Sequence, residues 1–310
     1  MKIAVIGPGA VGCLLAVSCA EAGEDVLLVD YRPERVALLR EQGILLKTPG
    51  GLSRLLPVPC GLPAEVGPCG LTIMAVKAHQ TRAAAQALPL LMAPGGLALS
   101  LQNGLGNLEE MARVAGPERL LAGVTFVGVT RQDEGKIIYA GQGEVVIGAP
   151  PGAKVTPGEI DAVAALFRRA GFKCRVAADI QALIWEKLVV NAGINPLTAL
   201  LRVPNGALPE LPEAWSLAVA AATEVQTVAR TLGLAVTGDP AERLGRVCRA
   251  TAKNRSSMLQ DVLAGRVTEI DSLNAQVAAR GAALGIPTPI NDLLTRLMRA
   301  VDASASWRVI

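Results

Sequence analysis

The stretch that decides the fold is residues 3–30, which read IAVIGPGAVGCLLAVSCAEAGEDVLLVD. A wholly apolar run at residues 3–6 is typical of a strand buried on both faces, and a Gly-x-Gly-x-x-Gly pattern follows it at once. We then expect a helix over Cys13–Ala22 and a second apolar strand over Val26–Val29, which ends at Asp30. Strand, glycine pattern, helix, strand and acid in this order predict a Rossmann-type unit that binds a dinucleotide.

The glycine pattern supplies the expected phosphate-binding turn. Glycines allow a tight turn and a close backbone approach, and the N–H groups that begin the next helix bind a pyrophosphate. Asp30 is the expected acceptor for the adenosine ribose hydroxyls, which favours NAD. Arg32 reads either as the holder of a 2′-phosphate, as in NADP enzymes, or as a solvated surface arginine, so the choice of cofactor stays open. The cofactor contacts expected from this stretch are Gly7, Pro8, Gly9, Ala10, Val11, Gly12, Asp30 and Arg32.

Two further strand patterns deliver polar residues to the same edge of the sheet. Leu71–Val76 leads to Lys77, and Leu97–Leu101 leads to Asn103. Ligands bind at the carboxyl ends of strands in open parallel sheets, so we expect Lys77 to neutralise a phosphate or face the ribose, and Asn103 to bond ribose, amide or substrate. The alternatives are an exposed loop lysine and an Asn-Gly turn. His79 reads as a helix-start residue rather than as a catalyst.

The chain changes character near residue 178. Before this point strands alternate with helices, and after it almost no strand pattern remains. We therefore expect an α/β protein with a doubly wound, Rossmann-type dinucleotide-binding domain over residues 1–178 and an all-helical substrate and catalytic domain over residues 179–310. The other predicted elements are strands at Leu120–Val129, Lys136–Ala140, Glu144–Gly148 and Phe172–Val176 that complete the sheet, a turn over residues 48–51, an Ala-rich helix that ends near Leu91, and helices at Pro33–Arg40, Ile160–Ala170, Pro212–Gly233, Pro240–Ala250, Glu269–Leu284 and Asn291–Val301.

The helix expected after Asp179 carries a polar stripe. The helix is mostly apolar, yet Lys187, Asn191 and Asn195 recur at every fourth residue and so lie on one face. Buried polar groups cost free energy unless they are paired, so this face must meet a partner, either protein or ligand. Pro196 disfavours helical backbone at the residue before it, and we therefore expect the helix to end or bend at Asn195.

A second polar group lies further along the helical half. Asn254 and Ser257 are three residues apart, hence neighbours on a helix or turn, and Glu269 stands at an expected helix start. Hydride transfer to a keto group leaves an alkoxide, which the Lys187 ammonium can stabilise and protonate while a carboxylate holds the ammonium in place. Asn and Ser side chains can bind a hydroxyl and a carboxylate of the substrate. Taken singly, Glu269 reads equally well as a capping residue, and Asn254 with Ser257 as a loop-ordering network.

The composition excludes several classes of function. Hydrophobic residues make up 51% of the 310 residues and aromatic residues only 3%, so aliphatic side chains must fill the core. The formal net charge of +3 is scattered, which argues against nucleic-acid and membrane partners. Six cysteines form no CxxC pair and there is one histidine, which argues against a metal site. Scattered thiols, no signal-peptide pattern and no apolar run of membrane-spanning length lead us to expect a cytoplasmic protein.

From end to end, the chain resembles the ketopantoate reductase (2-dehydropantoate 2-reductase) family. The most specific part is the lysine and asparagine stripe together with the segments SSMLQD at 256–261 and TEID at 268–271. The other matching pieces are GPGAVG at 7–12, VK at 76–77, QNG at 102–104, WEKL at 185–188, Asn191, NPLT at 195–198, PNG at 204–206 and Asn254.

The resemblance implies a role for each candidate residue. Lys187 would donate a proton to the ketone oxygen, and Glu269 would orient that lysine and touch the cofactor ribose. Lys77 and Asn103 would hold the cofactor, and Gly128 would place a backbone group on the nicotinamide side. The implied reaction reduces ketopantoate to (R)-pantoate with NADPH, on the pathway to pantothenate and coenzyme A. The residues implied to surround the substrate are Lys187, Asn191, Asn195, Asn205, Asn254 and Ser257.

One departure from the family pattern concerns the cofactor. Family members that prefer NADPH commonly carry a basic residue directly after the second strand, whereas here Asp30 and Tyr31 stand there and arginine comes only at 32. An aspartate opposes a 2′-phosphate by like charge, so use of NAD(H) beside or instead of NADP(H) stays open.

Two other functions remain alternatives. The first is a reductase of another small 2-keto acid on the same scaffold. The second is a catalytically silent nucleotide-binding regulator, against which the presence of Lys187 and Glu269 argues. The expected partner in either enzyme is a small-molecule 2-keto acid, and a homodimer is compatible with the long helical half.

Overall fold

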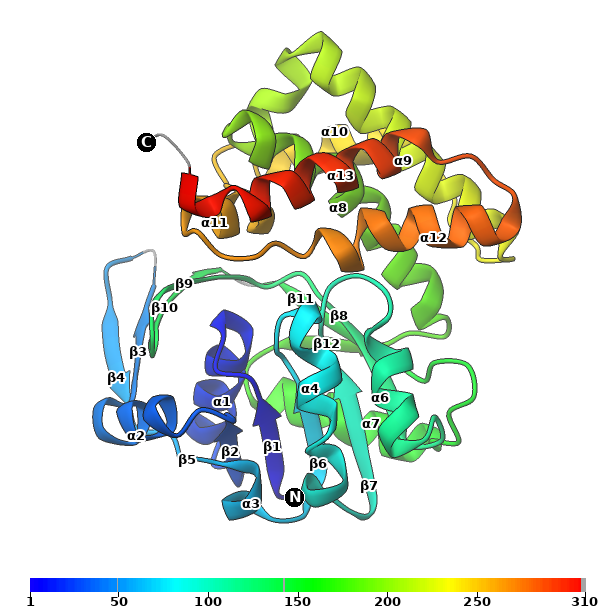
Figure 1. Ribbon diagram of the computed structural model, residues 1–310. Coiled ribbons are helices and arrows are strands. Elements are labelled where there is room, and N and C mark those ends of the chain that lie inside the picture. The colour runs from blue at the N-terminus through cyan, green and yellow to red at the C-terminus, as the bar shows by residue number, and fades with distance from the viewer. Residues whose placement is uncertain (49, 142, 308–310) are drawn as a thin grey trace. The chain divides into compact units, whose positions relative to one another are not determined.

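The computed structural model describes residues 1–48, 50–141 and 143–307, and the chain divides into two compact units (Figure 1). The first unit contains Met1–Gln102 and Asn107–Ile180, and the second contains Asn103–Gly106 and the residues from Gln181 onward. The division thus falls two residues after position 179, the expected start of the helical half. The short segment Asn103–Gly106 groups with the helical unit, although the residues on either side of it in the sequence do not.

The first unit is built on an eight-stranded sheet of order β12-β11-β8-β7-β6-β1-β2-β5 (Figure 1). Neighbouring strands run parallel, except that β11 pairs antiparallel with β8. The strands are β1 (Ile3–Ile6), β2 (Val26–Val29), β5 (Cys60–Gly61), β6 (Cys69–Met74), β7 (Met92–Ser100), β8 (Leu120–Thr125), β11 (Glu144–Gly148) and β12 (Lys173–Val176).

Helices cover both faces of this sheet. They are α1 (Ala10–Glu21), α2 (Pro33–Gln42), α3 (Pro63–Val66), α4 (Thr81–Ala85), α5 (Leu88–Leu91), α6 (Asn107–Ala115) and α7 (Pro157–Arg169), with a 3-10 turn, η1 (Ala78–Gln80). Successive residues of a strand point to opposite faces. Ile3 and Val5 of β1 are buried with residues of α1 and α7, whereas Ala4 and Ile6 are buried with residues of α5 and α6. The prediction of a doubly wound α/β unit is therefore confirmed.

The Ala-rich helix expected to end near Leu91 is divided into η1, α4 and α5. Pro89 stands in the first turn of α5. Proline has no N–H to donate and its ring clashes with the preceding turn, so it begins a new helix more readily than it continues one. The prediction of one continuous helix here is wrong for that reason.

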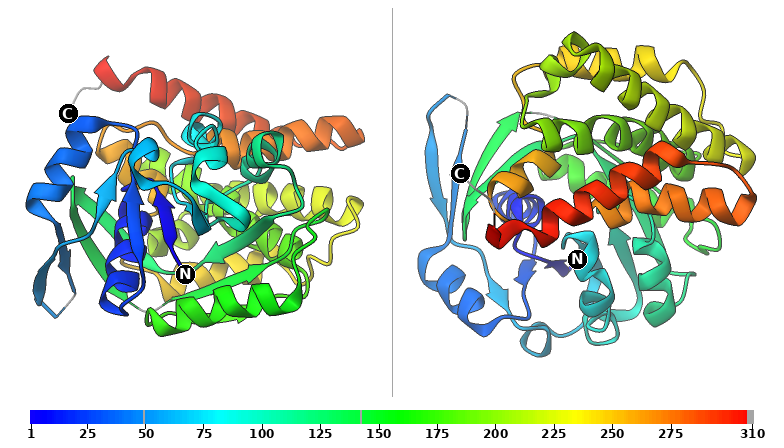
Figure 2. Two further views of the ribbon diagram at one scale, coloured as in Figure 1. Left: turned by 90° about the horizontal axis from the view of Figure 1, so that it is seen from below. Right: turned by 45° about the horizontal axis from the view of Figure 1, so that its top comes forward.

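One predicted strand, Lys136–Ala140, and the end of another, Leu120–Val129, lie outside the main sheet. They form an antiparallel hairpin in a second, four-stranded sheet of order β4-β3-β10-β9 (Figure 2). The prediction that Lys136–Ala140 completes the main sheet is wrong, as is a single strand over Leu120–Val129. β10 pairs with β3 instead, and Ile137 is buried with Ile44 and Leu46 in the cluster that contains α1. The strands of this sheet are β3 (Ile44–Lys47), β4 (Ser53–Leu56), β9 (Gly128–Asp133) and β10 (Lys136–Gly141).

The turn expected over residues 48–51 falls partly outside the described residues, because Pro49 is not among them. The strands on either side of it, β3 and β4, pair antiparallel from Lys47 with Ser53 to Ile44 with Leu56.

The described elements of the second unit are all helical. Its core contains Trp185, Leu188 and Val189 of the first long helix, together with aliphatic side chains of the later ones. Within the described residues, no helix is long and apolar enough to cross a membrane. The elements are α8 (Ile180–Leu201), η2 (Asn205–Glu210), α9 (Pro212–Thr231), α10 (Pro240–Ala250), α11 (Ser257–Leu263), η3 (Ile270–Ser272), α12 (Asn274–Leu284), α13 (Pro289–Ala303) and η4 (Ala305–Trp307).

Pro196 led us to expect that the helix ends or bends at Asn195; helix α8 does not end there but continues to Leu201. Proline leaves the carbonyl four residues earlier, that of Ala192, without its helical donor. The side chain of Asn274 supplies a replacement, because its Nδ2 donates to the Ala192 oxygen at 3.0 Å. A tertiary hydrogen bond from α12 thus satisfies the acceptor that Pro196 leaves open, and the helix runs through the proline.

Candidate active site

The glycine pattern begins α1 in the geometry that an anion-binding turn needs. Gly7 has a φ of +104°, and a Cβ there would lie 2.8 Å from the backbone nitrogen of Val76. A Cβ on Gly12 would overlap the Gly7 carbonyl oxygen, whereas a Cβ on Gly9 would make only an ordinary contact, at 3.8 Å, with the Ala75 carbonyl oxygen. No side chain caps α1, and its first turn has no acidic residue. The backbone N–H groups around Gly9, Ala10 and Val11 are therefore suited to the pyrophosphate of a dinucleotide.

Gln102 connects the two strand-end segments that carry Lys77 and Asn103. Its Nε2 donates to the Val76 carbonyl at 3.0 Å and to Thr81 Oγ1 at 2.6 Å. Thr81 in turn donates to Asn107 Oδ1 at 2.8 Å. The segments after β6 and β7 are thus held together, with Lys77 as the partly buried N-cap of η1. Gln102 lies in the QNG segment, but no sequence pattern pointed to this role.

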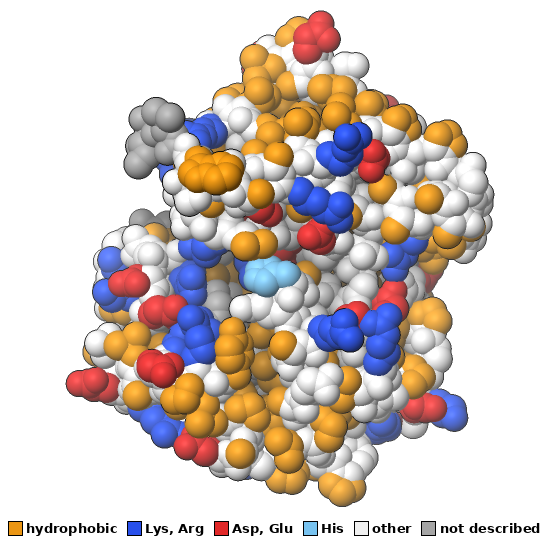
Figure 3. Space-filling view, in the orientation of Figure 1, with side chains coloured by type: hydrophobic (Ala, Val, Ile, Leu, Met, Phe, Trp, Pro, Cys, Tyr) orange, Lys and Arg blue, Asp and Glu red, His pale blue; other side chains and the backbone are white. Residues whose placement is uncertain are grey.

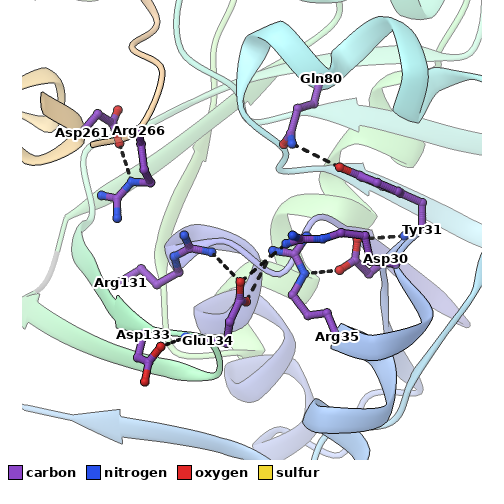
Figure 4. A network of polar contacts seen from close by, with 10 residues as sticks. Asp30, Tyr31, Arg35, Gln80, Arg131, Asp133, Glu134, Asp261 and Arg266 are labelled. Atoms are coloured by element: carbon purple, nitrogen blue, oxygen red, sulfur yellow. Dashed lines mark hydrogen bonds and ion pairs between the residues drawn. The ribbon is translucent and has the colours of Figure 1, made fainter. Parts of the chain in front are cut away.

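Asp30 is buried at the end of β2 and is engaged by its own chain (Figure 4). Its Oδ1 accepts the Tyr31 N–H at 2.8 Å, and its Oδ2 accepts from Arg35 Nε. Arg35 also pairs with Glu134 at 3.4 Å. The charge of Asp30 is therefore balanced by Arg35, which the sequence reasoning missed although it stands only five residues later, in the first turn of α2.

Glu134 is a further residue that the sequence alone did not reveal. It lies in the turn between β9 and β10, and its carboxylate is 3.5 Å from both Arg32 and Arg131. No sequence pattern marked it, because the hairpin was expected in the main sheet. Arg32 is an exposed arginine that makes a 3.5 Å pair with Glu134.

Gly128 begins β9 and is exposed. It pairs with Gly141, and a Cβ on it would make only ordinary contact, at 3.4 Å, with the Cβ of Ala140. The backbone conformation therefore does not require glycine at this position.

In the second unit, α8 carries Lys187, Asn191 and Asn195 on its polar stripe. Burial lowers the pKa of Lys187 to about 8, and the charge of Glu269 acts in the opposite direction by raising it. Glu269 is 7% exposed and stands at the N-terminus of η3. The charge of Glu269 therefore acts on Lys187, and both are residues that the sequence singled out.

The segment that contains Asn103 is attached to the turn that follows Glu269. The Leu105 N–H donates to the Ser272 carbonyl at 2.8 Å, and the Ser272 hydroxyl donates to the Glu269 carbonyl at 3.0 Å. Gly104 has a φ of +80°, and a Cβ there would overlap the Ser272 carbonyl oxygen. A glycine is therefore required next to Asn103, and Asn103 belongs to the same unit as Glu269.

Asn205 and Asn254 meet through their backbones. The Asn205 N–H donates to the Asn254 carbonyl at 3.0 Å, and Asn205 Nδ2 donates to Thr251 Oγ1 at 2.9 Å. Asn205 Oδ1 is buried and has no hydrogen-bond partner among the described residues. An unsatisfied buried acceptor of this kind is suited to a ligand hydroxyl.

The SSMLQD segment is joined to α8 through its first serine. Ser256 Oγ lies 2.8 Å from Thr198 Oγ1 and caps α11 by accepting the Leu259 N–H at 3.1 Å. Thr198 is three residues beyond Asn195, so this contact lies one helical turn from the polar stripe. Ser257 itself is exposed, as is Asn254 in the preceding loop.

The predicted residues thus fall into two groups, one in each unit. The cofactor candidates from Gly7 to Gly12 and Asp30, Arg32, Lys77 and Gly128 lie in the first unit. Asn103 and all the catalytic and substrate candidates lie in the second.

Basic and acidic side chains are interspersed over the face shown in Figure 3.

The chain matches known proteins over nearly its whole length. Residues 3–152 match the family model described as ketopantoate reductase PanE/ApbA, and residues 179–302 match its C-terminal counterpart. The 2-dehydropantoate 2-reductase of Halobacterium salinarum is 36% identical over 300 residues, which cover 96% of this chain and 98% of the relative.

Solved structures agree with these sequence matches. A PanE/ApbA family ketopantoate reductase from Ralstonia eutropha JMP134 has a TM-score of 0.88 and 31% identity, covering 99% of this chain and 100% of its own. D-mandelate dehydrogenase with NADH and anilino(oxo)acetate has a TM-score of 0.90 and 26% identity, covering 99% of each chain. On the family matches and the full-length identity, the chain belongs to the ketopantoate reductase family.

Proposed function

We propose that this chain is a 2-dehydropantoate 2-reductase, which reduces ketopantoate to (R)-pantoate with NADPH in the biosynthesis of pantothenate and coenzyme A. The observation that carries the proposal is the coupling of Lys187 to Glu269 in a member of this family. A lysine with a pKa of about 8 can donate a proton near neutral pH, which a lysine with its ordinary pKa does less readily.

The first unit is the proposed dinucleotide-binding domain, and the second the proposed substrate and catalytic domain. Gly7 to Gly12 would hold the pyrophosphate, and Lys77, Asn103 and Gly128 would contact the rest of the nucleotide. When bound, the reduced nicotinamide supplies a hydride to the keto carbon. NADP(H) is the cofactor proposed from the family, and NAD(H) also fits because Asp30 lies at the end of β2.

Lys187 acts as the proposed general acid. With a pKa of about 8, roughly nine-tenths of its side chains are ammonium at pH 7. The ammonium hydrogen bonds to the keto oxygen, stabilises the negative charge that develops there, and transfers its proton to that oxygen. Glu269 keeps the lysine charged and oriented, since its carboxylate favours the ammonium form.

Neutral hydrogen-bonding groups are proposed to position the keto acid. Asn205 Oδ1 is a buried acceptor that can accept a hydrogen bond from a substrate hydroxyl. The amide groups of Asn191, Asn195 and Asn254 and the Ser257 hydroxyl would bind the remaining polar atoms of the substrate.

A reductase of another small 2-keto acid is the second candidate. One observation favours it: D-mandelate dehydrogenase, solved with NADH and anilino(oxo)acetate, is as similar in fold as the ketopantoate reductase from Ralstonia eutropha. The same lysine and carboxylate pair could act on either substrate.

The test follows nicotinamide absorbance with NADPH and with NADH against ketopantoate and a panel of 2-keto acids that includes phenylglyoxylate. We expect the highest kcat/KM with ketopantoate. A higher value with another keto acid would favour the second candidate, and no turnover with any of them would favour a silent regulator.

The role of Lys187 is tested by Lys187→Ala, for which we expect at least a hundredfold loss of kcat. Lys173→Ala is the matched control, because Lys173 is an exposed lysine on β12, and it should leave kcat unchanged. Near-normal turnover of Lys187→Ala would refute the proposed mechanism.

A further inference from the structure

Three arginines and two carboxylates form a cluster of ion pairs at the end of β2, and Figure 4 labels Asp30, Arg35, Arg131 and Glu134 among them. Glu134 lies 3.4–3.5 Å from Arg32, Arg35 and Arg131, and Arg35 also pairs with Asp30. Three positive and two negative charges leave one net positive charge. We call these five residues the β2-end cluster.

The position of Glu134 is fixed by its hairpin. The turn contains Gly135 with a φ of +64°, and the Leu45 N–H donates to the Gly135 carbonyl at 2.7 Å. A Cβ on Gly135 would lie 2.9 Å from a methyl of Leu39 in α2. The turn therefore packs against the helix that begins at the end of β2, and it keeps Glu134 opposite Arg32 and Arg35.

Only one of the two carboxylates is free to respond to a ligand. The Asp30 side chain is 3% exposed and engages both Tyr31 and Arg35. The Glu134 side chain is 33% exposed and shares its charge among three guanidinium groups at distances typical of weak, exchangeable pairs.

We propose that Glu134 determines cofactor specificity, by competing with the 2′-phosphate of NADPH for the guanidinium groups of Arg32 and Arg131. In a Rossmann unit the adenosine ribose lies at the end of the second strand, which is where this cluster is found. Arginine is the side chain best suited to bind a phosphate in bidentate fashion. The inference rests on the proposed use of a nicotinamide dinucleotide.

The expected size of the effect follows from the charges. A carboxylate a few ångströms from a phosphate that carries nearly two negative charges, in largely aqueous surroundings, changes affinity about three- to tenfold. NADH has no 2′-phosphate, so its affinity should change less than twofold.

The experiment measures the binding of NADPH and NADH to the purified full-length protein by calorimetry, at low salt and without keto acid. In Glu134→Gln we expect the ratio of the NADH to the NADPH dissociation constant to rise about three- to tenfold, and to rise less in 0.5 M NaCl. The double variant with Arg32→Ala and Glu134→Gln should show at most half of the rise in this ratio that Glu134→Gln shows alone.

The matched control is Asp133→Asn, which removes the same charge one residue away. Asp133 pairs with Lys136 at 3.2 Å, so the ratio should change less than twofold. An unchanged or lower ratio in Glu134→Gln, or an equal rise in Asp133→Asn, would overturn the inference.

A second variant and the wild type keep the outcomes distinguishable. Glu134→Asp keeps the carboxylate but moves it further from the guanidinium groups. The ratio of the NADH to the NADPH dissociation constant should therefore rise, but less than in Glu134→Gln. A fall in this ratio would contradict the inference even if Glu134→Gln did not fold. Wild-type protein that binds neither nucleotide would refute the proposed function together with the inference. If the wild type binds the nucleotides and the ratio of the two dissociation constants is unchanged in the Glu134 variants, only the inference is refuted.

Discussion

The side chain of Asn274 tests how α8 accommodates Pro196. Asn274 is completely buried, and its Nδ2 donates to the Ala192 carbonyl at 3.0 Å and to Asn291 Oδ1 at 2.9 Å. Asn274→Ala would leave both acceptors unpaired, at about 1–3 kcal/mol each. Asn274 Oδ1 has no hydrogen-bond partner among the described residues, so removing this unsatisfied acceptor offsets about 1 kcal/mol of that cost. We therefore expect the free energy of unfolding to fall by about 1–5 kcal/mol.

Pro196→Ala separates the two hydrogen bonds. Alanine restores the N–H that an uninterrupted helix donates to the Ala192 carbonyl. In that background only Asn291 Oδ1 is left unpaired, so Asn274→Ala should cost about 1–2 kcal/mol less than it does beside the proline. Gln226→Ala is the matched control: it removes a hydrogen bond from a buried side chain to the Gly238 carbonyl at 2.8 Å, and its cost should be equal in both backgrounds.

Tryptophan fluorescence during urea unfolding measures the free energy of unfolding of the second structural unit, to which Asn274 belongs. Trp185, Trp215 and Trp307 are the only tryptophans of the chain, and all three lie in the second unit. A double-mutant cycle that is additive within about 0.3 kcal/mol would refute the reasoning, because Asn274 would then act independently of the missing helical donor.

The remaining predictions concern the catalytic pair and the Asn103 segment. Because only the ammonium form of Lys187 donates a proton, kcat/KM for keto-acid reduction should be constant below pH 8 and fall about tenfold per unit above it. In Glu269→Gln the carboxylate that raises this pKa is lost, so the inflection should move below pH 8; an inflection that stays in place would contradict the coupling. Gly104→Ala places a Cβ on the Ser272 carbonyl and should lower the free energy of unfolding by more than about 2 kcal/mol. The control is Gly285→Ala, at a φ of +69° with open space around it, which should lower the free energy of unfolding by about 1 kcal/mol. Equal losses for Gly104→Ala and Gly285→Ala in urea unfolding would exclude a clash with the Ser272 carbonyl.

Local patterns were sufficient to predict the fold class. The apolar run at residues 3–6, the glycines and Asp30 define a strand, a turn and a second strand within 28 residues, and each signal depends only on its neighbours. The polar stripe was equally visible, because a lysine and two asparagines at every fourth residue stand out on an apolar helix. The partner of Lys187 within the protein, Glu269, came from the family resemblance and from its chemistry, and not from spacing.

Features that depend on distant partners could not be predicted in the same way. An apolar run such as that of β10 does not specify whether it pairs with β3 or with the main sheet. Pro196 carries a strong local signal to end a helix, and only Asn274, 78 residues later, removes the cost. The β2-end cluster joins residues about 100 positions apart, and Glu134 had no pattern of its own.

The grouping of Asn103–Gly106 with the helical unit affects how the chain can be dissected. The polypeptide passes from one unit to the other three times, after residues 102, 106 and 180, so the units are not consecutive modules. A gene fragment that stops at residue 180 would encode Asn103 without the Ser272 carbonyl that anchors its neighbour Leu105. Recombining the front half of one family member with the back half of another should therefore succeed best when the QNG segment and the TEID turn come from the same parent.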